Sequence, residues 1–196
     1  QYNGRNESAL FYIHGNKHPE CMKLLIENTD DIHIRDFDDK SLLMRAASLN
    51  EPDTAALLLK KGARINEINR YGLSALLYSI INNSYEAFLL LAKSGADLHI
   101  ADKNGNTALA RAAVSDTRIL QYLLPFFPDK NLKNADGKTA AFFAFEKGKY
   151  IHLKLLLENG ADPDIPDAAG KTLLMTAAEN KNAAAAEILL EHNASL

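Results

Sequence analysis

The stretch GADLHIADKNGNTALARAA at residues 95–113 decides the fold, because versions of it occur along the whole chain. In this stretch Thr107 is followed two residues later by an apolar residue. Six Ser or Thr residues share this feature: Ser8, Ser41, Ser74, Thr107, Thr139 and Thr172. Successive members are 33 residues apart, except that Thr107 and Thr139 are 32 apart. Self-similarity at such a period predicts a solenoid of stacked repeats, in which each repeat contacts its neighbours.

Every repeat carries the same order of local signals. Two residues before each Ser or Thr stands a residue type that tolerates a positive φ, which predicts a tight turn. These residues are Asn6, Asp39, Gly72, Gly105, Gly137 and Gly170. The Ser or Thr itself is placed as the N-cap of a short first helix. A second helix follows, and a glycine after it predicts its end at Gly62, Gly95 and Gly160.

Two further columns of residues fall on the second helix. One column lies sixteen residues after each Ser or Thr and holds Leu24, Leu57, Leu90, Leu123, Leu155 and Ile188. The other is a column of small, mostly buried residues, and it contains Cys21, Thr54, Ala87, Leu120 and Ala185. Because Cys21 is the single cysteine, it cannot form an internal disulfide or a thiolate zinc site.

With these motifs the sequence resembles the ankyrin-repeat proteins. Residues 62–77, 95–113 and 160–178 are similar to the family pattern G-A-D-x-N…D-x-x-G-x-T-P-L-H-x-A-A, and the resemblance covers essentially the whole chain. It implies an all-α ankyrin-repeat solenoid of stacked helix-turn-helix units with projecting hairpin-like loops. We expect a single ankyrin-repeat domain over residues 1–196, with repeats at about 3–35, 36–68, 69–101, 102–133, 134–166 and 167–196.

The sequence departs from the family pattern at the His of T-P-L-H. That column holds Phe11, Met44, Leu77, Ala110, Phe142 and Met175, and Ala or Leu replaces the Pro. We therefore expect apolar packing to carry more of the stability than it does in the family.

Repeat 4 departs in length, because it is one residue short. Pro125 and Pro128 are expected to end its second helix early, since proline has no N–H and disfavours helix in the residue before it. Phe126 and Phe127 lie between the two prolines. We interpret them as filling the gap left by the missing residue, and the alternative is a bulge that contacts a partner.

The composition excludes several classes of protein. Hydrophobic residues make up 47% of the chain, too many for a disordered protein, and no stretch approaches the roughly 18 apolar residues of a membrane span. The net charge of −3, with both signs interspersed, gives no basic surface for nucleic acid. We expect a soluble monomer without cofactor or membrane insertion; the cytoplasm is favoured, and export as an effector stays open. The last residues, HNASL, match the start of a repeat loop, so we expect the native chain to continue.

No arrangement of residues predicts catalysis or a metal site. His14 and His18 have the spacing of a helical metal pair, but Gly15 and Pro19 place the link between two helices there. Most carboxylates fall in loops, where Asp caps turns through backbone hydrogen bonds. These are Asp36, Asp38, Asp39, Asp97, Asp102, Asp162, Asp164 and Asp167. No glycine-rich phosphate loop, G-x-S-x-G or HExxH motif is present, so we predict that the chain is not an enzyme.

The resemblance implies a module that binds a protein or peptide on the concave face of the solenoid. The alternative is a structural spacer within a longer chain whose flanking regions carry the activity. In the family, the partner faces the hairpin tips and the last residues of the first helix, and here apolar, aromatic and arginine residues gather at those positions in repeats 2–4. The predicted contact residues, centred on Tyr71, are Phe37, Leu49, Arg70, Tyr71, Leu73, Ile81, Lys103 and Val114. The alternative for Phe37, Leu73 and Ile81 is packing against a neighbouring hairpin or helix.

Overall fold

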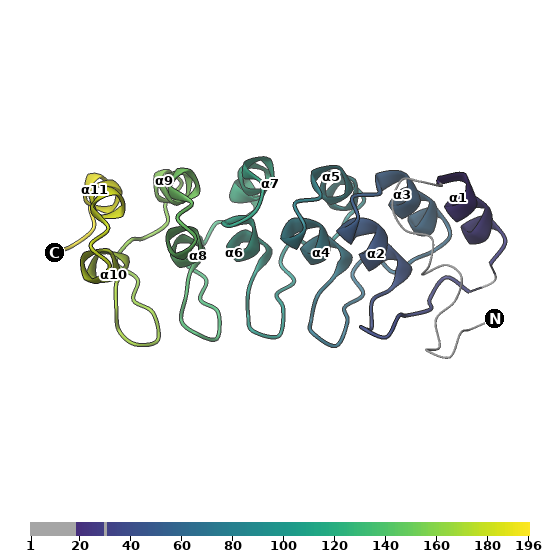
Figure 1. Ribbon diagram of the computed structural model, residues 1–196, viewed down its shortest axis with the longest axis horizontal. Helices are drawn as coiled ribbons and strands as arrows, with labels where there is room; N and C mark the ends of the chain where they lie inside the picture. The colour runs from purple at the N-terminus through teal and green to yellow at the C-terminus, as the bar shows by residue number, and fades with distance from the viewer. Residues whose placement is uncertain (1–18, 30) are drawn as a thin grey trace. The chain divides into compact units, whose positions relative to one another are not determined.

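The computed structural model describes residues 19–29 and 31–196, and every regular element among them is a helix (Figure 1). β-Structure in this part of the chain is limited to two isolated bridges, Arg35 with Ser41 and Ile68 with Ser74. The predicted all-α repeat architecture is therefore confirmed. The chain divides into two compact units, residues 1–100 and 101–196, which are described separately.

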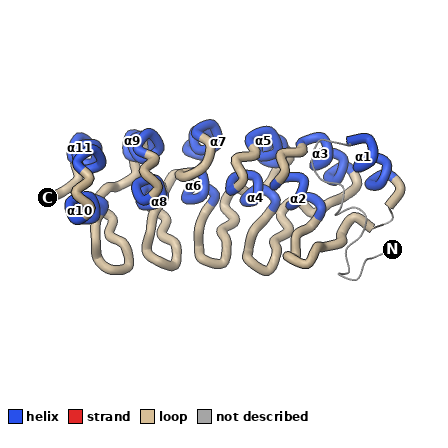
Figure 2. Tube along the Cα trace, viewed as in Figure 1, coloured by secondary structure: helices blue, strands red, loops and turns tan. Residues whose placement is uncertain are grey.

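Unit 1, residues 1–100, contains the described helices α1 (Pro19–Glu27), α2 (Leu42–Ser48), α3 (Pro52–Lys60), α4 (Ala75–Ile81) and α5 (Tyr85–Lys93). The first helices α2 and α4 pack against each other, and the second helices pack as α1 on α3 and α3 on α5. Figure 2 shows the loops that precede α2 and α4 projecting away from the second helices. Repeats 2 and 3, whose two helices are both described, are therefore each a helix pair with one projecting loop.

Unit 2, residues 101–196, contains three further helix pairs. Their helices are α6 (Ala108–Ala112), α7 (Thr117–Leu123), α8 (Ala140–Glu146), α9 (Tyr150–Glu158), α10 (Leu173–Glu179) and α11 (Ala183–Glu191), and a 3₁₀ helix, η2 (Leu124–Phe126), follows α7. Within each pair the first helix packs against the second. In addition, α6 packs against α8 and α9 packs against α11, so neighbouring pairs share a core.

The predicted N-caps are confirmed in four repeats. The hydroxyl oxygens of Ser41, Ser74, Thr107 and Thr172 each accept a hydrogen bond from the backbone N–H three residues later, at 3.2–3.3 Å. Thr139 also occupies the N-cap position of α8, but its side chain makes no capping hydrogen bond. Four of the five first helices described therefore begin with one free backbone donor satisfied by a side chain.

The turn column has the left-handed conformation that its residue types predict. The φ angle is +62° at Asp39 and lies between +74° and +78° at the four glycines, Gly72, Gly105, Gly137 and Gly170. A further left-handed column, which glycine marks in only one repeat, joins the two helices of a repeat. It consists of Asn50, Asn83, Gly148 and Lys181.

Buried apolar side chains fill the column that holds His in the family. Met44, Leu77, Ala110 and Phe142 are at most 3% exposed, whereas Met175 in the last repeat is exposed. The sulfur of Met44 also accepts a hydrogen bond from the backbone N–H of Ser41 at 3.4 Å. In repeats 2–5 a buried apolar side chain therefore packs where the family has the histidine.

The missing residue of repeat 4 lies in the link between α6 and α7. In the other described repeats the N-cap of the second helix stands ten residues after the Ser or Thr, but here it is Asp116, nine residues after Thr107. The helix α6 has five residues where the other first helices have seven. None of residues 113–116 has a positive φ, so the left-handed link residue is the one deleted.

This deletion corrects two column assignments. Leu123 does not belong with Leu57 and Leu90. It matches the fully buried leucines one position later, which are Leu58, Leu91, Leu156 and Leu189. By the same shift, Ile119 rather than Leu120 occupies the column of Ala87 and Ala185. The sequence-based assignment was wrong because it placed the deletion after the second helix instead of before it.

The end of repeat 4 agrees with its prolines, but only partly with the interpretation of its phenylalanines. The helix α7 ends at Leu123, before Pro125, as predicted. Phe127 is buried in the core, whereas Phe126 is exposed and stacks on Tyr122 with 5.5 Å between ring centres. Phe127 therefore packs at the end of α7 while the missing residue lies at its start, and the filling role assigned to Phe126 is wrong.

Several predictions concern residues outside the described part of the chain. These are Asn6, Ser8, Phe11, His14, His18 and the side chain of Cys21.

Candidate protein-binding surface

Each hairpin loop is held by an Asp or Asn five residues before the N-cap. Its Oδ1 atom accepts hydrogen bonds from the backbone N–H groups two and four residues later, at 2.8–3.0 Å. The five residues are Asp36, Asn69, Asp102, Asn134 and Asp167. This is the turn-capping role predicted for the loop carboxylates. It gives the hairpin tips a fixed backbone from which the other side chains project.

In repeats 2 and 4 the same Asp also pairs with an Arg of the first helix. Nη1 of Arg45 lies 3.1 Å from Oδ2 of Asp36. In repeat 4, Nε of Arg111 donates to Oδ2 of Asp102 at 3.2 Å, and that carboxylate is almost completely buried. These ion pairs fix each loop to the helix behind it.

Repeat 3 uses a neutral contact at the same place. Nδ2 of Asn69 donates to the hydroxyl of Tyr78 at 3.0 Å, and burial raises the pKa of the Tyr78 phenol. The ammonium group of Lys40, from the neighbouring repeat, lies 5.1 Å from the centre of the Tyr78 ring. A cation of repeat 2 therefore lies over the face of an aromatic ring of repeat 3.

The pKa of Asp102 links one of these ion pairs to acid stability. Burial alone would raise the pKa of this carboxyl, but the hydrogen bonds from Arg111 and Asn106 outweigh burial and lower it. Since the folded-state pKa is below the unfolded one, the ionised carboxylate stabilises the fold above the unfolded pKa. That contribution is lost as the pH falls through the folded pKa.

We therefore expect Asp102→Asn to flatten the acid limb of the stability curve. Asn stands in the same column at Asn69 and Asn134, so the turn is retained. The free energy of unfolding, measured by urea titration, should fall less steeply for the variant than for the wild type between about pH 5 and pH 3. The exposed Asp136→Asn serves as the matched control and should retain the wild-type slope. Equal slopes for Asp102→Asn and the wild type would contradict the assignment.

The hairpin tips of repeats 2 and 3 hold one another. The backbone N–H of Arg70 donates to Oδ2 of Asp39 at 2.6 Å, and its guanidinium donates to the carbonyl oxygen of Phe37. Arg35 spans the same gap, because it pairs with Asp39 at 2.9 Å and with Glu67 at 2.8 Å. The two tips are therefore fixed to each other by ion pairs and backbone contacts.

Two columns of side chains meet on one face of a repeat, which we call the inner face. One column stands directly before the N-cap and the other seven residues after it. In repeats 5 and 6 these columns form ion pairs at 2.6 and 2.7 Å, between Lys138 and Glu146 and between Lys171 and Glu179. Repeat 3 has Leu73 and Ile81 in these columns. Its inner face is therefore apolar where the later repeats carry paired charges.

Tyr71, Leu73 and Ile81 form what we call the repeat-3 patch. Tyr71 is 50% exposed and Ile81 is 41% exposed, while Leu73 is half-buried. The guanidinium of Arg70 lies 5.6 Å from the centre of the Tyr71 ring. Phe37, at the neighbouring tip, is 63% exposed. Packing against neighbouring elements thus leaves Phe37 mostly exposed and Ile81 partly exposed.

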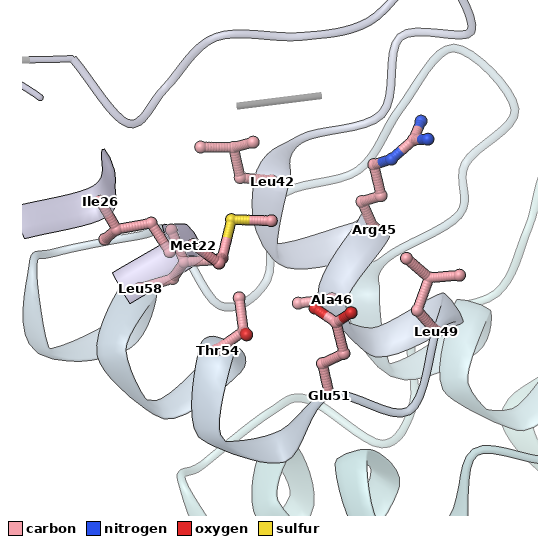
Figure 3. A pocket seen from close by; sticks show the side chains of 9 residues that line it. All are labelled: Met22, Ile26, Leu42, Arg45, Ala46, Leu49, Glu51, Thr54 and Leu58. Atoms are coloured by element: carbon pink, nitrogen blue, oxygen red, sulfur yellow. The ribbon is translucent and has the colours of Figure 1, made fainter. Parts of the chain in front are cut away.

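Leu49 is the predicted contact residue that also lines a pocket. Leu49 is exposed at the end of α2, and it lines a small pocket between α1, α2 and α3 (Figure 3). The other lining residues are Met22, Ile26, Leu42, Arg45, Ala46, Glu51, Thr54 and Leu58. The free volume of about 10 Å³ holds no more than one water molecule, so this pocket does not fit a small-molecule ligand.

Lys103 and Val114 belong to unit 2. Lys103 is exposed at the hairpin tip of repeat 4, and Val114 is half-buried after α6. They occupy the same columns as Arg70 and Ile81, respectively. The structure therefore brings together Phe37, Arg70 and the repeat-3 patch in unit 1 and keeps these two residues in another unit.

His152 is a buried polar residue that the sequence analysis does not single out. Its Nδ1 atom lies 2.8 Å from the carbonyl oxygen of Ala113, and its Nε2 atom lies 2.8 Å from the hydroxyl of Thr117. It stands in the column of Ala87 and Ala185. A large polar residue at a position that otherwise holds small buried residues is the sequence feature that could have indicated it. His152 therefore joins α9 to the shortened link of repeat 4.

Two other kinds of site are not found among the described residues. No three His, Cys, Asp or Glu side chains in residues 19–29 and 31–196 are grouped so that they could hold a metal ion. In the same part of the chain, no helix is long and apolar enough to cross a bilayer.

Comparison with known proteins identifies the family. The family model for ankyrin repeats (3 copies) matches residues 1–69 and 113–196. The B-cell lymphoma 3 protein homolog of Mus musculus is 31% identical over 70% of this chain and 32% of its own length. Ankyrin repeat and SOCS box protein 6 of Homo sapiens is 32% identical over 67% of this chain and 34% of its own length. Ankyrin repeat protein OPG189 of monkeypox virus is 26% identical over 98% of this chain and 34% of its own length.

The chain thus spans about a third of the length of these relatives. Ankyrin repeats are generally protein–protein interaction modules, and the family is generally non-enzymatic. The match to the family, the repeat period and the helix pairs with their projecting loops agree, and the chain belongs to the ankyrin-repeat family.

Proposed function

We propose that the chain binds a protein or peptide on its inner, concave face, and that the repeat-3 patch is the centre of this contact in unit 1. The observation that carries the proposal is the exchange of residue types in the two inner-face columns. Where repeats 5 and 6 pair Lys with Glu, repeat 3 has the half-buried Leu73 and the exposed Ile81, with the exposed Tyr71 two residues before Leu73. A contiguous exposed apolar surface is typical of a contact site, whereas a structural spacer needs only a soluble surface.

The backbone under the patch supports this role. Oδ1 of Asn69 holds the amides of Tyr71 and Leu73 at 3.0 Å, and the tip of repeat 3 is tied to Asp39 of repeat 2. A partner would therefore meet side chains on a fixed backbone, and this loop would lose less conformational entropy on binding. Tyr and Arg are also the residue types enriched among the residues that dominate binding energy.

The remaining predicted residues extend the proposed surface. Phe37 and Arg70 border the repeat-3 patch at the hairpin tips, and Leu49 adds an exposed apolar side chain at the end of α2. Lys103 and Val114 are proposed as separate contacts in unit 2, since they occupy the equivalent columns of repeat 4.

We expect Tyr71→Ala to weaken peptide binding at least about fivefold, which corresponds to about 1 kcal/mol. Half of the Tyr71 side chain is exposed, so the free energy of unfolding should change by less than about 0.5 kcal/mol. The probes are peptides selected from a random displayed library against the intact chain, and their affinities are measured by fluorescence anisotropy.

Ile151→Ala is the matched control, because Ile151 is 77% exposed on the second helix α9 and lies outside the inner-face columns. It should leave the affinities unchanged. Peptides that lose affinity on Ile151→Ala but not on Tyr71→Ala would show that the contact lies elsewhere. If no selected peptide bound the chain saturably, the alternative function of a structural spacer would be favoured.

A further inference from the structure

We infer that the partner of the repeat-3 patch places a carboxylate against Arg70, so that the bound segment is an acidic peptide with an apolar side chain close to an Asp or Glu. This inference rests on the proposed function, because it names the chemistry of the segment that the patch binds.

The first observation is the pairing of arginines in unit 1. Arg35, Arg45 and Arg64 lie 2.8, 3.1 and 3.9 Å from the nearest carboxylate oxygen. The guanidinium of Arg70 lies within 4.0 Å of no carboxylate in the part of unit 1 that the structure describes, although the backbone N–H of this residue donates to Asp39. The nearby carboxylates of Asp39 and Glu67 both pair with Arg35. The guanidinium beside the patch therefore lacks the ion pair that the other described arginines of this unit have.

The second observation is that the Arg70 side chain is already oriented. One of its terminal N–H groups donates to the carbonyl oxygen of Phe37, and the guanidinium lies 5.6 Å from the centre of the Tyr71 ring. That hydrogen bond uses one of five donors, so the others remain for a ligand. A guanidinium held in this way loses less conformational freedom when it binds, and its planar donors match a carboxylate.

The third observation is the position of Arg70 relative to the apolar surface. It directly precedes Tyr71, whose half-exposed ring lies next to its guanidinium, and the guanidinium also donates to the backbone carbonyl of Phe37. A carboxylate bound here is partly shielded from water by the Tyr71 ring, which strengthens its attraction to the cation. The apolar side chain of the same segment then reaches Leu73 and Ile81.

The test uses synthetic peptides with one fixed central Leu or Phe and a neighbouring position that is Glu, Gln or Lys in an otherwise identical Ser and Ala background. We expect the Glu peptides to bind the intact chain at least about fivefold more tightly than the Gln peptides, and the Lys peptides to bind most weakly. Arg70→Gln should abolish the preference for Glu, and raising the salt concentration should reduce it. Arg64→Gln, at an exposed and weakly paired arginine, should leave the preference intact.

The outcomes separate this inference from the proposed function. Glu and Gln peptides that bind equally, or a Glu preference that survives Arg70→Gln, would overturn the acidic partner. Binding that still depends on Tyr71 would leave the proposed function standing in that case. If no peptide binds in a manner that depends on Tyr71, both fail together.

Discussion

Gly137→Ala is expected to lower the free energy of unfolding by about 3–4 kcal/mol, whereas Gly170→Ala should lower it by only about 1 kcal/mol. The two glycines occupy the same turn column and have nearly the same φ, +74° and +78°. A Cβ atom at Gly137 would lie 2.5 Å from the backbone nitrogen of Ala168 and 3.0 Å from the carbonyl carbon of Asp167. At Gly170 the same atom would meet nothing within 4 Å.

The comparison isolates the close approach of two hairpins. Both substitutions impose the strain of a left-handed Ala, but only the one at Gly137 pushes apart the backbones of repeats 5 and 6. The backbone N–H of Ala168, which donates to the carbonyl of Asp136 at 3.1 Å, would have to move. Urea unfolding of the two variants measures the difference. Equal losses of stability would show that backbone conformation alone requires glycine in this column.

The parts of the fold that the sequence predicted depend on local residue types. The turn column, the N-caps and the end of α7 each follow from what Gly, Ser, Thr or Pro allows the backbone to do. Because these residues repeat with a nearly constant period, one correct local interpretation holds for the turn column in repeats 2–6 and for four of the five described N-caps. Ser41 and Asp39 in repeat 2 thus have the same roles as Thr172 and Gly170 in repeat 6.

The register of repeat 4 could not be read in the same way. Apolar residues at Ile119, Leu120, Leu123 and Leu124 fit the core in either of two registers, so periodicity alone does not place the deletion. The different burial of Phe126 and Phe127 follows from that register, since the register decides which of the two side chains faces the core. His152 was missed for a related reason, because its two partners, Ala113 and Thr117, lie in and directly after the irregular link of repeat 4.

The sequence predicted which repeat positions contribute to the candidate surface, but not which of their side chains lie next to one another. The spacing of the repeats selects Leu73 and Ile81, but their meeting on one face is visible only from the ion pairs that the same columns form in repeats 5 and 6. Whether the guanidinium of Arg70 forms an ion pair depends on which carboxylates pair with the other arginines. Such pairing is set by tertiary geometry, and no local pattern records it.

His152→Ala is expected to lower the free energy of unfolding by about 3 kcal/mol. Ala occupies the same column in repeats 3 and 6, so the α9 helix itself tolerates the change. The loss arises in repeat 4, because the buried carbonyl of Ala113 and the half-buried hydroxyl of Thr117 both lose a partner 2.8 Å away. A buried polar group left without its hydrogen bond costs about 1–3 kcal/mol, and the cavity left by the imidazole adds to this.

Two control variants distinguish the loss of the whole imidazole from the loss of one hydrogen bond and from the loss of an exposed histidine. Thr117→Val keeps the shape of the side chain and removes only the hydroxyl, so it should cost about 1 kcal/mol. His99→Ala, at an exposed loop position, should change stability by less than about 0.5 kcal/mol. Urea unfolding gives the three values, and hydrogen exchange at the amides of residues 113–117 should rise most in His152→Ala if the histidine holds the shortened link in place. A loss for His152→Ala no greater than that for Thr117→Val would mean that the link keeps its conformation without the imidazole. The shortening of repeat 4 would then be compensated by the packing of α7 alone.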